Sequence, residues 1–146
     1  MEAKRILLVD DDRDLVMSIE AYLATRGFAV ATAHNGREAY ARIVEKRPDL
    51  IVLDVMMDYD EEGMVFASAL KTDEPTKDIP IIILSGFNVQ KDVREKVIAS
   101  LMGQDIPSDT FMEKPVRLSD LAQRIDLLLE RHAELHPSQR IEEVVE

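Results

Sequence analysis

Short apolar runs that alternate with longer stretches of helical periodicity restrict the folds open to this chain. Five of these runs are rich in β-branched residues, and the strands they predict cover residues 6–9, 30–33, 50–53, 79–84 and 109–112. The third run is apolar on both faces, which is typical of a parallel strand that is covered on both sides. The alternation therefore predicts repeated strand–helix units around a parallel sheet.

The intervals between the strands carry the spacing of amphipathic helices. After the first strand, Leu15, Val16, Ile19 and Leu23 recur at helical spacing, and Gly27 is expected to end that helix. Further helices are predicted at residues 37–46, with Ala39, Ile43 and Val44 facing inward, and at 64–71, 91–102 and 118–131. With right-handed crossovers, these units form an α/β fold with a doubly wound, five-stranded parallel sheet, (βα)5, of strand order 2-1-3-4-5.

Polar side chains that can bind ions follow four of the predicted strands. Asp10 and Asp11 follow the first strand, Asp54 the third, Ser85 the fourth and Lys114 the fifth. The carboxyl ends of parallel strands share one edge of the sheet, and this strand order places the first and third strands side by side. The three carboxylates should converge on a cation, while the hydroxyl and the ammonium can bind an anion. The combination indicates phosphoryl chemistry with Mg²⁺.

Composition narrows the function further. The 146 residues suit one domain, expected at residues 1–131, followed by a polar tail or linker at 132–146. Zero cysteines and no apolar run long enough to span a bilayer favour a cytoplasmic protein. The net charge of −11 disfavours direct contact with nucleic acid or membrane, and no Lys/Arg cluster marks a basic patch.

The residues from Lys4 to about Arg131 resemble the receiver domain of two-component response regulators. The resemblance rests on four motifs in the expected order, namely Asp10-Asp11, the lone Asp54, Ser85-Gly86 and Lys114-Pro115. It implies a flavodoxin-like fold and a role in a phosphorelay. A sensor histidine kinase or phosphotransfer protein would supply the phosphoryl group, and a partner-binding face would switch in response. The family is not enzymatic beyond its own phosphorylation and dephosphorylation.

The resemblance also implies roles for the acidic residues. Asp54 corresponds to the phospho-acceptor, and Asp11 to the carboxylate that binds Mg²⁺ directly. Asp10 corresponds to a residue that supports the ion through water, and the backbone carbonyl of Met56 to the remaining protein ligand. Asp12 is expected to cap the first helix instead.

Other residues are expected around the phosphoryl group. Ser85 and Lys114 correspond to the hydroxyl and ammonium that contact its oxygens, and the Lys114–Pro115 bond is cis in this family. Ser85 would also act with Phe111, the aromatic switch on the fifth strand, although an aromatic residue on a strand also suits a core. Met56, Gly86 and Phe87 would flank the phosphoryl group. Because Met56 and Phe87 are apolar and cannot orient water, self-dephosphorylation should be slow.

The chain departs from the family pattern after Asp54. Asp58 stands where a proline is common and Gly63 comes one residue late, so the loop at 58–62 is unusually acidic. It suits a solvated loop, or else a second cation contact or a partner-selecting patch. Two other functions remain open: an interaction module that needs no phosphorylation, and a Mg²⁺-dependent phosphatase, which Met56 disfavours. The face formed by the fourth helix, fifth strand and fifth helix could bind a downstream protein or a second copy.

Overall fold

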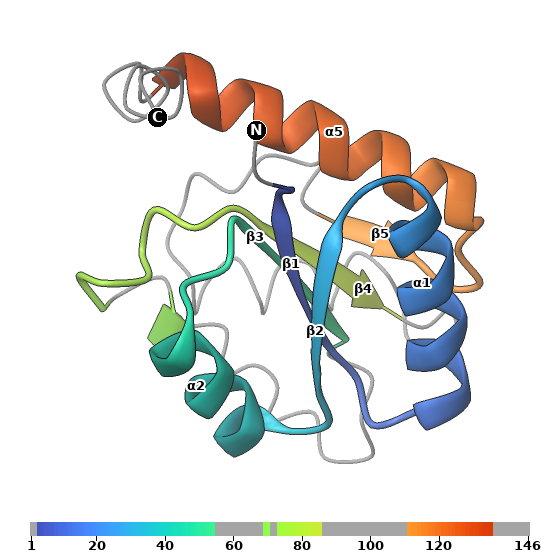
Figure 1. Cartoon of the computed structure of the whole chain (residues 1–146), viewed down its shortest axis with the longest axis horizontal. Coiled ribbons are helices and arrows are strands. Elements are labelled where there is room, and N and C mark those ends of the chain that lie inside the picture. Colours follow the sequence, from blue (N-terminus) through green and yellow to red (C-terminus); the bar gives the residue numbers. More distant parts are fainter. Residues whose placement is uncertain (1–2, 55–68, 71–72, 86–110, 136–146) are drawn as a thin grey trace.

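The computed structural model describes residues 3–54, 69–70, 73–85 and 111–135. Its five strands form one all-parallel sheet of order β2-β1-β3-β4-β5, as the sequence predicts (Figure 1). The strands are β1 (Arg5–Val9), β2 (Ala29–Ala33), β3 (Leu50–Asp54), β4 (Ile81–Ser85) and β5 (Phe111–Glu113). The helices whose bounds lie within the described residues are α1 (Arg13–Thr25), α2 (Gly36–Glu45) and α5 (Leu118–Leu135).

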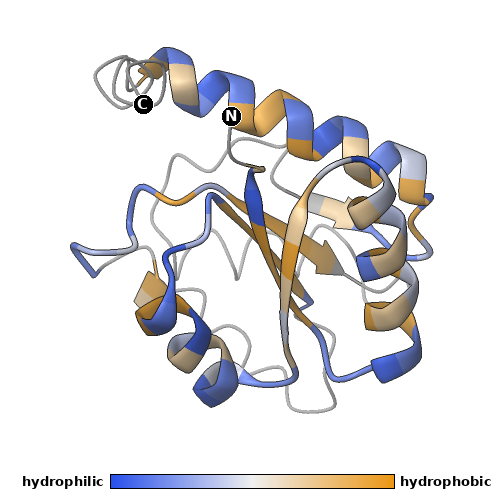
Figure 2. Ribbon diagram, in the orientation of Figure 1, coloured by the Kyte–Doolittle hydropathy of each residue, from blue (hydrophilic) through white to orange (hydrophobic). Residues whose placement is uncertain are grey.

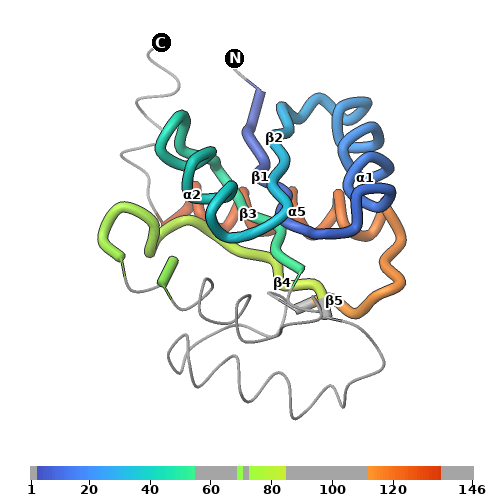
Figure 3. Tube along the Cα trace, turned by 90° about the horizontal axis from the view of Figure 1, so that it is seen from below, coloured from blue at the N-terminus to red at the C-terminus, as the bar shows by residue number. Residues whose placement is uncertain are grey.

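Two apolar clusters hold the layers together, one on each face of the sheet. Alternate residues of the strands, such as Ile6 and Leu8, pack with α1 and α5 on one face. Leu7 and Val9, which lie between them in the sequence, pack with Ala39 of α2 on the other. Figure 3 shows α1 and α2 on either side of β1 and β2, and Figure 2 shows the strands largely in apolar colours. This two-sided burial explains the continuous apolar runs of the central strands.

The ends of α1 follow the expected local rules. The Asp12 side chain caps the first turn by accepting a hydrogen bond from the Leu15 backbone N–H at 3.1 Å, which confirms its predicted capping role. Arg26 is the C-cap, and the following Gly27 has a φ of 90°, a backbone conformation that favours glycine. The sequence thus fixes both ends of the helix that leaves β1.

Several predicted boundaries differ from the structure. β3 and β4 each extend to the polar residue that follows the apolar run, namely Asp54 and Ser85. β5 spans Phe111–Glu113 rather than 109–112, and α5 continues beyond Arg131 to Leu135. The inward position predicted for Val44 is wrong, since 83% of this residue is exposed.

Two predicted helices fall on residues outside the described ranges, apart from residues 69 and 70, which are helical. The division between domain and tail at residue 131 stays a prediction. In the described ranges, no helix has both the length and the apolar character required to cross a bilayer.

Candidate functional site

Three consecutive aspartates after β1 have different structural roles. Asp10 is 1% exposed, and its backbone N–H continues the sheet by donating to the Ala33 carbonyl at 3.0 Å. Its Oδ1 accepts a hydrogen bond from the Asp12 backbone N–H at 2.9 Å, which turns the chain toward α1. Asp11, between them, is exposed. The turn therefore buries one carboxylate, leaves the next at the surface and uses the third to begin a helix.

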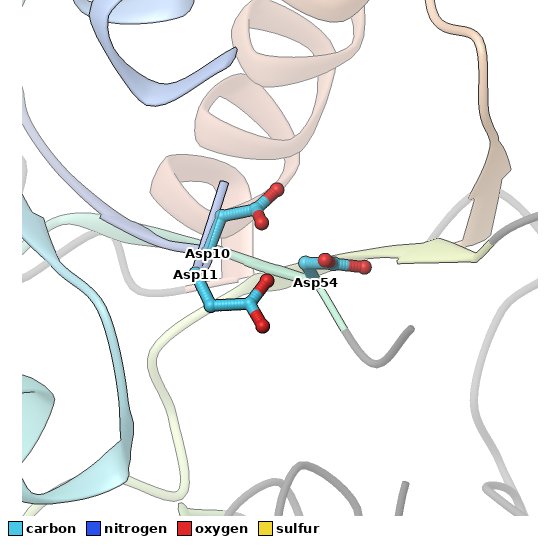
Figure 4. A group of neighbouring side chains, drawn as sticks. All are labelled: Asp10, Asp11 and Asp54. Atoms are coloured by element: carbon cyan, nitrogen blue, oxygen red, sulfur yellow. The ribbon is translucent and has the colours of Figure 1, made fainter. Parts of the chain in front are cut away.

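Asp54 comes to the same place from the centre of the sheet. It is the last residue of β3, a strand buried along its whole length, and is itself 2% exposed. Asp54 pairs in register with Leu84 of β4. Because β3 lies beside β1, the Asp54 carboxylate lies close to those of Asp10 and Asp11, as Figure 4 shows.

Lys114 joins the two buried carboxylates. It directly follows β5, and its Nζ lies 3.1 Å from Asp10 Oδ2 and 3.0 Å from Asp54 Oδ2. The lysine side chain is 21% exposed, whereas those of the two aspartates are almost completely buried. The Lys114–Pro115 peptide bond is cis, as the resemblance implies. One ammonium therefore contacts residues that lie 104 and 60 positions away along the chain.

The proton affinities of this group reflect its burial. Burial, which removes solvent from the carboxyl group, raises the pKa of Asp10 from 3.8 to about 6, and the nearby Asp54 charge adds to the rise. The hydrogen bond from the Asp12 N–H and, more weakly, the Lys114 charge lower this pKa. Burial lowers the pKa of Lys114, but the attraction of Asp54 and Asp10 outweighs it, so this pKa lies above its ordinary value. The ammonium stays charged, while one of its carboxylate partners is costly to ionise.

The three carboxylates suit a hard divalent cation. Asp10, Asp11 and Asp54 each offer an oxygen, and these oxygens lie within 4.8 Å of one another. Mg²⁺ prefers oxygen ligands in octahedral geometry and retains water in its shell, which fits a site that has one exposed member. Buried neighbouring carboxylates also repel one another, so a cation would relieve a cost that Lys114 offsets only in part. The donor chemistry thus fits the predicted ion.

Two further predicted site residues, Ser85 and Phe111, lie in strands, and the structure shows the position of their backbone. Ser85 ends β4 and pairs in register with Glu113, directly before Lys114. Phe111 begins β5 and pairs with Ile83. Ser85 therefore lies on the strand next to Asp54 and Phe111 on the strand beyond it, although their side chains, like Met56, Gly86 and Phe87 as a whole, are outside the described residues.

Sequence reasoning placed these groups at one edge but did not identify the contacts between them. No pattern in the chain distinguishes Asp10 from Asp11 as the partner of Lys114. The distinction follows from the pleat of β1 and the turn after it, which bury Asp10 and expose Asp11.

Comparison with known proteins identifies the class to which this fold and site belong. The model of the response regulator receiver domain matches residues 6–126, and the chain is a member of that family. The transcriptional regulatory protein PrrA of Mycobacterium tuberculosis is 37% identical over 127 residues, which cover 87% of this chain and 50% of PrrA. The response regulator MprA of Mycobacterium avium is 36% identical, with 87% and 51% covered. The chain spans about half the length of these curated relatives.

Solved structures agree with this assignment. A CheY-like receiver domain protein from Methanospirillum hungatei superposes with a TM-score of 0.74 at 25% identity, over 91% of this chain and 98% of that one. The receiver domain of a signal transduction histidine kinase from Syntrophus aciditrophicus gives 0.72 at 30% identity, over 88% and 91%. The chain is thus a response regulator receiver domain with the flavodoxin-like sheet order of its CheY-like neighbours.

Proposed function

We propose that this receiver accepts one phosphoryl group on Asp54 and thereby switches a protein-binding face. The observation that carries the proposal is the Lys114 ammonium, held 3.0 Å from the Asp54 carboxylate at the edge where Asp10 and Asp11 also gather. The Asp54 carboxylate thus lies beside the Lys114 ammonium and among oxygens that can bind a divalent cation. Positive charge at these two places suits the transfer of a phosphoryl group, which carries several negative charges. Positioning and electrostatics supply most of the catalysis in such transfers.

The chemical step follows from these positions. An Asp54 carboxylate oxygen attacks the phosphorus of a phosphohistidine on a sensor kinase or phosphotransfer protein. The new O–P bond forms while the N–P bond breaks, and the imidazole leaves and takes up a proton. Lys114, which has three N–H donors, holds Asp54 in place and can donate to an oxygen of the incoming group.

Asp10, Asp11 and Asp54 would hold Mg²⁺, together with the Met56 carbonyl that the family resemblance implies. When bound, the ion supplies positive charge against the transferring phosphoryl group. Asp11 is the exposed member of the group, which suits a ligand that an ion meets first from solvent. Asp10 lies deepest and contributes charge to the site while its Oδ1 holds the turn.

The response would reach partners through β5 and α5. Ser85 ends β4 and pairs with Glu113, directly before Lys114, and Phe111 begins β5 three residues before that lysine, so a change at the phosphoryl site has a short path to this side of the sheet. Leu127 and Leu135 of α5 are exposed apolar residues, with 38% and 77% exposure. They suit contact with a downstream protein or a second copy of the chain. Phosphorylation would shift a pre-existing equilibrium between two arrangements of this face.

Intact mass after incubation with acetyl phosphate tests the proposal. We expect the wild type to gain the mass of one phosphoryl group in the presence of Mg²⁺ and none in EDTA. Asp54→Asn should gain nothing in either condition, and Asp78→Asn, an exposed aspartate away from the cluster, should match the wild type. An adduct that persists in Asp54→Asn would place the acceptor elsewhere.

Two further measurements, of beryllium fluoride binding and of phosphate ester turnover, decide between the proposal and its alternatives. If neither acetyl phosphate nor beryllium fluoride modifies or binds the wild type, the domain acts as an interaction module without phosphorylation. Catalytic turnover of a generic phosphate ester that is lost in Asp54→Asn would instead indicate a phosphatase. Only its own phosphorylation and dephosphorylation are expected, since residue 56 is methionine, where such phosphatases carry a second aspartate.

A further inference from the structure

In the part of the chain that the structure describes, no strand pairs with the outer edge of β2. β2 is an end strand of the sheet, and its sequence, Ala-Val-Ala-Thr-Ala, contains neither charge nor proline (Figure 1). Proteins commonly protect such edges with lysine, proline or a bulge, because the free backbone groups can pair with another strand. Ala29 and Ala31 of this strand have small side chains and are exposed.

The backbone groups available at this edge can be identified from the pairing with β1. Ala29 donates to the Lys4 carbonyl at 2.9 Å, and the Ala33 carbonyl accepts from Asp10 at 3.0 Å. In a parallel ladder the groups of alternate residues face the same neighbour, so those of Val30 and Thr32 face outward. Arg42 Nε donates to the Thr32 carbonyl at 3.2 Å. Within the described chain, the Val30 N–H and C=O and the Thr32 N–H therefore have no backbone partner.

A basic pocket lies next to this edge, on the face covered by α2. It has a volume of about 300 Å³ and an apolar lining that includes Leu7, Ala29 and Ala31. Arg5 from the start of β1, together with Arg42 and Lys46 from the end of α2, supplies positive charge to it, against Glu45 alone. No Lys/Arg cluster marks this pocket in the sequence, because its cations come from separate segments that the fold brings together.

The charges of this pocket are mostly uncompensated. Arg42 lies 3.4 Å from Glu45 in an exposed pair, which contributes little. Among the described residues, no carboxylate forms an ion pair with the side chain of Arg5 or Lys46, although the Asp49 carboxylate accepts a hydrogen bond from the Arg5 backbone N–H at 2.8 Å. Arg42 and Lys46 also complement the negative end of the α2 dipole, but Arg5 comes from a strand and has no such role. A concentration of cations is unexpected on a chain with a net charge of −11.

We propose that the β2 edge and this pocket bind an acidic, extended segment of a partner protein. The segment would add a strand beside β2 and pair with the free groups of Val30 and Thr32. Its side chains on the α2 face would place carboxylates near Arg5, Arg42 and Lys46. A second copy of the chain is a poorer partner, because pairing of two β2 edges would bring the same cations of both copies together. Nucleic acid is also a poorer partner, because the negative net charge of the chain repels its phosphates. This surface lies at the amino-terminal side of β1, at the end of the sheet opposite the aspartate cluster.

The first test uses a blocked peptide of alternating glutamate and valine, with a lysine–valine peptide as its control. We expect the acidic peptide to bind weakly, in a salt-dependent way, and the basic peptide not to bind. Amide hydrogen exchange should slow by about tenfold or more at Val30 and Thr32 when the acidic peptide is present at saturation. The Ala31 amide, which already pairs with β1, should change little. Binding without protection of Val30 and Thr32, or no binding, would overturn the proposal.

Charge reversal provides the second test. Arg42→Glu combined with Lys46→Glu should weaken binding of the acidic peptide about tenfold or more and create binding of the basic one. Arg37→Glu combined with Lys77→Glu makes the same change in net charge on exposed residues that do not line the pocket. This control should retain the acidic peptide. Equal losses in both variants, or self-association of the wild type through β2 in sedimentation, would contradict the assignment.

Discussion

Replacing Asp10 by asparagine should stabilise the metal-free protein. Burial raises the pKa of Asp10 from 3.8 to about 6, so the folded chain is harder to ionise at this position than the unfolded chain. That difference corresponds to about 3 kcal/mol of folding free energy at neutral pH. Asparagine removes the charge and keeps an oxygen that can accept the hydrogen bond from the Asp12 N–H, but it loses the contact of Asp10 Oδ2 with Lys114, so about 3 kcal/mol is the upper limit of the gain.

The stability gained by Asp10→Asn should increase with pH. A carboxyl group with a raised folded-state pKa binds more protons in the folded chain, so its ionisation costs stability as the pH rises from about 4 to 6. The advantage of Asp10→Asn should therefore be at most about 3 kcal/mol at pH 7 and above and at most about 1 kcal/mol at pH 4.5. Asp78→Asn, at an exposed position, should change the stability by less than about 0.5 kcal/mol.

Urea unfolding in EDTA, followed by far-ultraviolet circular dichroism, measures the effect, because the chain has no tryptophan. The expected gain corresponds to an increase of at most about 1–2 M in the midpoint at pH 7. Saturating Mg²⁺ should then stabilise the wild type more than the variant, since the variant lacks one of the three carboxylates. An Asp10→Asn protein that is no more stable than the wild type at pH 7 would refute the reasoning.

Three further substitutions test other parts of the molecule. Asp12→Ala removes the N-cap of α1 and should lower the free energy of unfolding by about 1 kcal/mol in the same assay, while Asp12→Ser should restore most of it. Gly27→Ala should lower the free energy of unfolding by about 1–2 kcal/mol because the glycine has a φ of 90°, while an added Cβ would meet no neighbouring atom. Gly27→Asn should lower it less, and equal losses in the two variants would contradict a cause in the backbone conformation. Met56→Asn combined with Phe87→Glu should accelerate loss of phosphate from Asp54, measured by intact mass over time, and an unchanged rate would show that these positions do not control access of water.

The sequence predicts the sheet well because its central strands are buried on both faces. Continuous apolar runs mark β1, β3 and β4, and the strand order follows from right-handed crossovers. The ends of strands are less predictable, since Asp54 and Ser85 continue the ladder although they are polar. Backbone pairing, rather than hydropathy, decides where these strands stop.

The helical spacing of apolar residues does not predict which face of a helix is buried or where the helix ends. Tyr40 and Ile43 of α2 pack on the core, whereas Val44 points to solvent because the buried stripe of this helix is narrow. α5 continues to Leu135 because the residues after Arg131 are compatible with a helix and the next proline is residue 137. Tertiary contacts therefore select one face from several that the helical period allows.

The contacts of the site depend on features that no short motif contains. The spacing of the aspartates predicts that they meet, but only the fold shows that Lys114 lies between Asp10 and Asp54. The resulting arrangement is strained in an electrostatic sense, with two buried carboxylates that share one ammonium and a third carboxylate within reach. Folding alone would favour fewer charges here, as the predicted stability of Asp10→Asn expresses. A cation bound at this edge would recover part of the stability lost there, so cation binding and folding stability should be linked.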